Sequence, residues 1–169
     1  MGVVRSPPRG VPFVGRGDEL GALIGFVSQA RRGQLTLAAV EGEPGIGKTR
    51  LLDEAQRELE RLGFMVLRAG ADELGRGDLL RIPLQALGLG SEKPADSTID
   101  FPGALRFRLI QAVIGNLEDR CRSGPVALIL DDLQWVDPAT LLLLRSLPDR
   151  MAGFPLAVIY AYRPLVAGR

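Results

Sequence analysis

The stretch VEGEPGIGKTRLLDE, residues 40–54, joins a glycine-rich turn to a lysine and a run of helix-forming residues. Only two of the 21 basic residues are lysines, so arginine supplies the ordinary surface charge. A compact, flexible ammonium can reach between phosphate oxygens, whereas a planar guanidinium prefers paired acceptors. We therefore expect Lys48 to do something that arginine could not. A solvated lysine at the start of a helix is the alternative.

Residues 42–49 match the pattern G-x-x-x-x-G-K-[ST] at every fixed position. A predicted strand, QLTLAAVEG, precedes this segment, and a helix predicted over residues 48–62 follows it. Backbone N–H groups around glycines at this spacing form an anion-binding nest, and the helix N-terminus adds partial positive charge. The sequence therefore predicts a phosphate-binding loop whose nucleotide contacts are Gly42, Glu43, Pro44, Gly45, Ile46, Gly47, Lys48 and Thr49. Lys48 would reach the β- and γ-phosphates as both a binding and a catalytic residue, and Thr49 would bind Mg²⁺. A glycine-rich turn that binds nothing is the alternative.

Length and composition indicate one soluble domain: 169 residues, 46% hydrophobic, with a net charge of +1. No secretory signal or membrane-length apolar run is apparent, so we expect a cytoplasmic protein without membrane contact. The single cysteine, Cys121, excludes an intrachain disulfide. The absence of histidine removes the usual proton shuttle and the commonest metal ligand.

Alternating strand and helix patterns run along the rest of the chain. Residues 1–10 are expected to form an unpacked, disordered tail, and residues 11–169 the domain. A helix with Asp18 as its N-cap is expected before Gly33, followed by the strand, loop and helix above. Further strands are predicted in FMVLRAGA, VALILDD and PLAVIYAY, and further helices over residues 79–87, 102–122 and 138–147. Such β-loop-α-β units build parallel sheets, so we predict an α/β fold.

A second candidate site follows the most apolar strand, in VALILDDLQWVD. Asp131 is the predicted second Mg²⁺ ligand opposite Thr49, and Asp132 the predicted catalytic group that orients or deprotonates water. Alternatively, the two acids only cap a turn. Trp135 is expected to serve packing, and Asp137 to cap the helix that begins at Pro138. Arg163 ends the fourth strand, where it would either sense a γ-phosphate or remain solvated.

Four blocks together resemble the ATPase domain of the STAND signalling NTPases, within the AAA-like P-loop group. The blocks are FVGRGDEL, GEPGIGKTRL, LILDDLQWVD and YAYRP, and they span residues 12–164 in the family's order. The chain looks closest to bacterial large LuxR-type transcriptional regulators. The resemblance implies a P-loop NTPase three-layer sandwich with a parallel sheet.

The resemblance also implies roles for individual residues. Val14, Gly15 and Arg16 would lie near the adenine and ribose, Arg50 would join the nucleotide-binding loop, and Arg163 would be the sensor of the γ-phosphate. The family's NTPase domain is a switch, closed with ADP and opened toward self-association by inducer and ATP. The implied cofactors are therefore ATP or ADP with Mg²⁺, and hydrolysis would be slow.

By the same resemblance, we expect a core truncated after its fourth strand. A fifth strand, lid domains and a C-terminal DNA-binding domain would be missing, so DNA contact would need a domain outside this chain. The segment LTLAAV would then be an exposed apolar edge. Two alternatives remain. A small phosphotransferase would need an acceptor pocket and an arginine-bearing lid over the nucleotide, for which Arg76 and Arg81 lie in a plausible loop. It would leave FVGR and DDLQWVD unexplained. A catalytically inactive fragment would act only as an oligomerisation surface.

Overall fold

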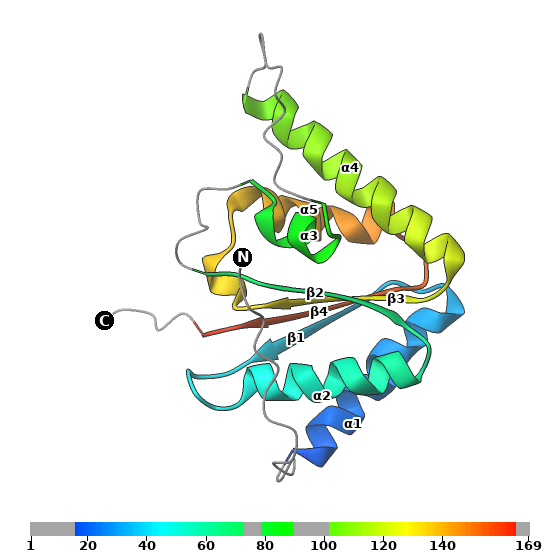
Figure 1. The fold of residues 1–169 in the computed structure, drawn as a ribbon, viewed down its shortest axis with the longest axis vertical. Helices are drawn as coiled ribbons and strands as arrows, with labels where there is room; N and C mark the ends of the chain where they lie inside the picture. The colour runs from blue at the N-terminus through cyan, green and yellow to red at the C-terminus, as the bar shows by residue number, and fades with distance from the viewer. Residues whose placement is uncertain (1–15, 73–78, 90–101, 165–169) are drawn as a thin grey trace.

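The computed structural model describes residues 16–72, 79–89 and 102–164. It confirms the predicted α/β fold: a parallel four-stranded sheet lies between two layers of helices (Figure 1). The strands are β1 (Thr36–Glu41), β2 (Met65–Gly70), β3 (Val126–Asp131) and β4 (Leu156–Tyr162), in the order β1-β4-β3-β2. The predicted tail, residues 1–10, lies outside the described residues.

Two helices cover one face of the sheet: α1 (Gly17–Val27), extended by the 3-10 helix η1 (Ser28–Arg32), and α2 (Lys48–Arg61) (Figure 1). Every second residue of β3 and β4 points to this face, as strand geometry requires. The buried cluster there contains Val27, Ala30, Ala38, Leu52, Leu59, Phe64, Ala127, Ile129, Ala157, Ile159 and Ala161. Burial of this apolar stripe holds α2, and so the loop before it, against the sheet.

Three helices cover the opposite face: α3 (Arg81–Ala86), α4 (Pro102–Ser123) and α5 (Pro138–Arg150). The 3-10 helix η3 (Leu133–Trp135) leads from β3 into α5. Leu128, Leu130 and Val158 supply the sheet side of this larger cluster. Cys121 is buried within it, and burial raises the pKa of its thiol to about 11. Cys121 is therefore an inert core residue.

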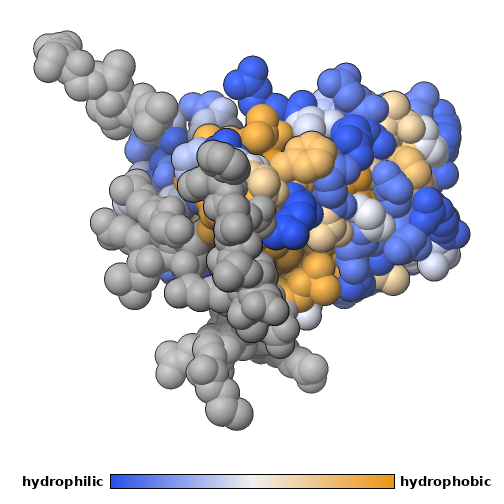
Figure 2. Space-filling view, turned by 90° about the horizontal axis from the view of Figure 1, so that it is seen from above, coloured by the Kyte–Doolittle hydropathy of each residue, from blue (hydrophilic) through white to orange (hydrophobic). Residues whose placement is uncertain are grey.

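The surface retains some apolar side chains. Phe107 lies on α4, and 61% of its surface is exposed. Viewed from above, apolar atoms gather toward the middle of the described surface, while hydrophilic atoms dominate its right-hand part (Figure 2). No described helix is both long enough and apolar enough to cross a membrane.

Within the described part of the chain, β1 is an edge strand that pairs with β4 alone. Its residues Leu37 and Ala39 are exposed, whereas Ala38 is buried under the α1 and α2 layer. The predicted exposed apolar edge is thus confirmed for these residues. An uncovered strand edge offers unpaired backbone groups to another chain.

The helix ends agree only partly with the sequence. Asp18 is not the N-cap of α1: the helix begins at Gly17 after Arg16, and Asp18 lies in the first turn. There its negative charge still interacts favourably with the positive end of the helix dipole. Gly33 ends the following 3-10 helix in a left-handed conformation, as predicted. Asp137 does cap α5, since its carboxylate accepts hydrogen bonds from the backbone of Ala139 and Thr140.

Asp137→Ala should destabilise the fold by about 1–2 kcal/mol, because the buried first-turn amides of α5 would lose their acceptor. Urea unfolding followed by circular dichroism measures this loss. Asp137→Asn, which keeps an acceptor oxygen, is the control and should lose less. Equal stability of wild type and the alanine variant would contradict the capping role.

Candidate nucleotide-binding site

The predicted phosphate loop connects β1 to α2 at the carboxyl end of the sheet, and most of it is exposed. Gly45 and Gly47 adopt positive φ angles of 78° and 94°, a conformation that glycine adopts without steric cost. The N–H of Gly42 donates to the carbonyl of Tyr162, which ties the start of the loop to β4. Helix α2 begins at Lys48, so the amides of its first turn adjoin the loop.

Lys48 is not a solvated surface lysine, because only 7% of its surface is exposed. Its Nζ donates to the carbonyl oxygens of Gly42 at 2.7 Å and Glu43 at 3.0 Å. The ammonium is thus folded back across its own loop. A buried ammonium needs acceptors, and phosphate oxygens could replace these carbonyls in a loop that is open to solvent.

The two acids predicted to act with the loop lie at the end of β3. Asp131 is buried, and its Oδ1 accepts the backbone N–H of Asp132 at 2.9 Å. Along β3, Asp131 continues the alternation of Ala127 and Ile129, which face the α1 and α2 layer. Asp132 has a left-handed backbone, with φ of 55°, which aspartate tolerates better than most residues. The two neighbouring carboxylates have different cationic partners: Arg68 lies 3.9 Å from Asp131, and Arg163 lies 3.8 Å from Asp132.

Asp132 belongs to a cluster with Arg163 and Gln134. Its Oδ1 accepts from Gln134 Nε2 at 2.9 Å and lies 3.8 Å from Arg163 Nη2. The backbone N–H of Arg163 donates to Gln134 Oε1 at 3.2 Å. The structure thus brings together the predicted catalytic acid and the predicted sensor. Gln134 joins them, which the sequence analysis did not anticipate, since an amide two residues after paired acids carries no distinctive signal.

The remaining predicted site residues are less closely tied to this arrangement. Thr49 is exposed in the first turn of α2, and Arg50 follows it. Arg16 immediately precedes α1, whereas Val14 and Gly15 lie outside the described residues. Across residues 16–72, 79–89 and 102–164, no group of three or more His, Cys, Asp or Glu side chains is arranged to hold a metal ion. A metal ion bound at the described residues would therefore need further ligands, such as the phosphate oxygens of a nucleotide that brings Mg²⁺ with it.

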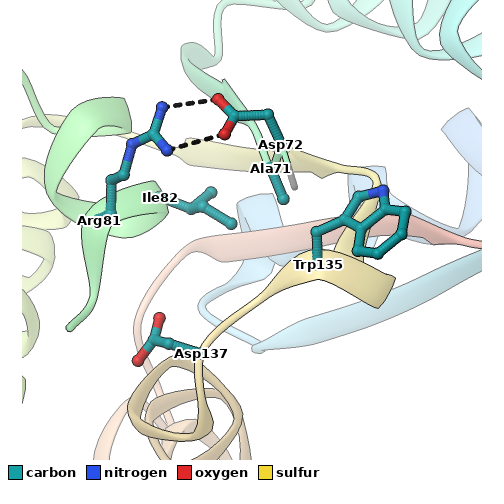
Figure 3. Close-up of a pocket in the computed structure, with 6 residues that line it drawn as sticks. All are labelled: Ala71, Asp72, Arg81, Ile82, Trp135 and Asp137. Atoms are coloured by element: carbon teal, nitrogen blue, oxygen red, sulfur yellow. Dashed lines mark hydrogen bonds and ion pairs between the residues drawn. The ribbon is translucent and has the colours of Figure 1, made fainter. Parts of the chain in front are cut away.

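A separate hollow lies beside the carboxyl ends of β2 and β3, where Ala71, Ile82 and Trp135 converge (Figure 3). Arg81 starts α3 and donates to both carboxylate oxygens of Asp72, at 3.0 and 2.7 Å. The suggested lid loop is therefore wrong for Arg81, which lies in a helix and is held by Asp72. Arg76, the other suggested lid residue, lies outside the described residues. Trp135 also lines this hollow and is half-buried, so its expected packing role stays a prediction.

Comparison with known proteins identifies the family. The model of the AAA ATPase domain matches residues 12–159, so the chain belongs to the AAA ATPase domain family. Its fold is that of a P-loop NTPase. An uncharacterised protein of Rhizobium meliloti (strain 1021) is 24% identical across 94% of this chain. The chain spans 19% of that protein's length.

Two of the solved structures that share the fold serve as examples. Cdc6p from Pyrobaculum aerophilum aligns with a TM-score of 0.66 at 19% identity, over 94% of this chain and 42% of that one. The ORC2 protein of Aeropyrum pernix, solved as ADPNP and ADP complexes, aligns with a TM-score of 0.60 at 18% identity. That match covers 96% of this chain and 44% of the other. At these identities the likeness establishes the fold, while function must be argued from the site.

Gly47→Ala should destabilise the protein by about 1–2 kcal/mol, because alanine is strained at the positive φ of this position. A Cβ would meet no atom within 4 Å, so backbone strain alone would cause the loss. Gly21→Ala, in open space on helix α1, is the matched control and should be neutral or stabilising. Chemical denaturation compares the two. A Gly47→Ala variant as stable as Gly21→Ala would argue against a constrained loop.

Proposed function

We propose that this domain binds ATP and ADP at the loop of residues 42–50. The observation that carries the proposal is the buried Lys48, whose ammonium is held by two loop carbonyls beside the N-terminus of α2. On nucleotide binding, the ammonium would exchange these carbonyls for β- and γ-phosphate oxygens. Backbone amides around Gly45 and Gly47 would then donate to the phosphates.

The donor set also fits Mg²⁺, which prefers carboxylate and hydroxyl oxygens and arrives on phosphates. Thr49 offers an exposed hydroxyl at the start of α2, and Asp131 a carboxylate at the end of β3. When bound, Mg²⁺ would neutralise charge on the β- and γ-phosphates. We assign Thr49 and Asp131 as its protein ligands.

Hydrolysis would depend on Asp132, which lies at the same sheet edge as Asp131 and is held by Gln134. Asp132 would orient a water toward the γ-phosphate, while Arg163 would sense that phosphate. Because Arg163 now lies 3.8 Å from Asp132, a γ-phosphate would compete with this carboxylate for the guanidinium. Such competition would link nucleotide binding to the position of Arg163, directly after β4. It would also make turnover slow.

We further propose that nucleotide exchange serves a regulatory switch in a bacterial signalling or transcriptional regulator of the STAND class. The four blocks that resemble LuxR-type regulators support this, and Arg16 of FVGR would lie near the adenine together with Val14 and Gly15. The switch would act through self-association in the ATP state. Any DNA contact would come from a domain beyond residues 1–169, in the cytoplasm.

Isothermal calorimetry with ATP and ADP, with and without Mg²⁺, tests the binding site. Wild type should bind both nucleotides, whereas Lys48→Ala should lose at least tenfold in affinity, because a buried ion pair to phosphate would be lost. Lys93→Ala, at the only other lysine, is the control and should bind as wild type. A folded wild-type domain that binds neither nucleotide would favour the inactive oligomerisation surface instead.

Asp132→Asn should retain ATP affinity within about twofold yet slow phosphate release by at least tenfold, since the amide cannot act as a base. Single-turnover hydrolysis with a phosphate sensor measures the rate, and calorimetry measures the binding. Gln134 can still donate to an amide oxygen in this variant, so the fold should persist. Unchanged turnover would remove Asp132 from the proposed mechanism.

A further inference from the structure

One arginine lies beside the proposed metal ligand and has no part in the function described so far. Arg68 is on β2, two positions from the strand's end, and 23% of its side chain is exposed. Its Nη1 donates to Asp53 Oδ1 of α2 at 2.6 Å and to Gln56 Oε1 at 3.2 Å. Its Nη2 lies 3.9 Å from Asp131 Oδ2. One guanidinium thus faces both α2 and the end of β3.

The two contacts are unequal. The contact with Asp53 is a short, charge-assisted hydrogen bond, whereas the contact with Asp131 is an ion pair at the limit of direct interaction. Asp131 Oδ1 is already engaged by the backbone of Asp132. Oδ2 accepts no hydrogen bond from the described residues, and Arg68 is the cation beside it. Asp53 therefore restrains a positive charge that would otherwise pair directly with Asp131.

We propose that the Asp53–Arg68 ion pair sets how strongly Asp131 binds the Mg²⁺ of the nucleotide. This inference rests on the proposed function. Arg68 is a positioning residue that acts through Asp131: it lowers the negative potential at that carboxylate and competes with the metal. Asp53 opposes this effect, since it holds the guanidinium on α2. Because α2 starts at the phosphate loop, the pair also ties β2, the neighbour of the strand that bears Asp131, to the helix that bears Lys48.

The two partners of this ion pair should have opposite effects on metal affinity. Arg68→Met removes the competing charge, so the Mg²⁺ concentration at half-saturation of ATP binding should fall about threefold or more. Asp53→Asn frees Arg68 to pair with Asp131, so the same midpoint should rise by a similar factor. Affinity for ATP without Mg²⁺ should fall in Arg68→Met and rise in Asp53→Asn, because ATP itself is anionic. Both midpoints can be read from fluorescent-nucleotide binding across a Mg²⁺ titration.

Control variants separate this effect from net charge and from packing. Glu54 and Arg57 form an exposed ion pair on the same helix, at 2.6 Å. Glu54→Gln and Arg57→Met change the net charge equally and should shift the midpoint by less than half as much. Arg68→Lys keeps the charge and should restore a midpoint near that of wild type. Thermal unfolding of each variant reports any loss of fold.

The outcomes distinguish the two proposals. Opposite shifts for Arg68→Met and Asp53→Asn, with small shifts in the controls, would support the inference. Shifts in the same direction, or none, in a wild-type background that binds Mg²⁺ and ATP would overturn it and leave the proposed function standing. A wild-type domain that binds ATP without any Mg²⁺ dependence would overturn it too. Absence of all ATP binding would overturn both proposals.

Discussion

The parallel register of the sheet is the constraint on which the candidate site depends. It pairs Glu41 with Tyr162 and Gly70 with Asp131, so the carboxyl ends of all four strands meet at one edge. At this edge the chain leaves the sheet through the phosphate loop, the paired acids and Arg163. In open α/β sheets, groups at this edge can converge on one ligand although they are far apart in sequence.

Local hydrogen bonds then hold the ends of β1 and β4 together. The hydroxyl of Tyr162 donates to Glu41 Oε2 at 2.8 Å, and this hydrogen bond raises the pKa of Tyr162 because it stabilises the neutral phenol. The carbonyl of Tyr162 also accepts from Gly42, the first residue of the loop. Arg163 follows directly, so any displacement of its side chain by a ligand would act on the strand that adjoins the phosphate loop.

The electrostatic arrangement at the edge has a common pattern. Three cations contact oxygen atoms at or beside the places where the proposed ligands would bind. Lys48 contacts the loop carbonyls, Arg68 lies beside Asp131, and Arg163 lies beside Asp132. Burial makes an unpaired charge costly at Lys48, and the two arginines also have internal acceptors, with Asp53 the nearer partner of Arg68. Binding of a nucleotide would therefore be an exchange of partners. Its affinity would reflect the difference between two sets of ion pairs.

The sequence by itself determined the succession of strands and helices along the chain, the glycine-rich loop, the cap at Asp137 and the paired acids, because these follow from local periodicity and from residues a few positions apart. The sequence misplaced the N-cap of α1: Asp18 is the second residue of the helix, and Arg16 precedes it. Several neighbouring polar residues made the first residue of the helix ambiguous. Only the tertiary structure decided that Arg68 lies between Asp53 and Asp131, and that Gln134 links Asp132 to Arg163. These contacts join residues on different elements, and their partners depend on strand order and on how α2 packs, which local patterns do not encode.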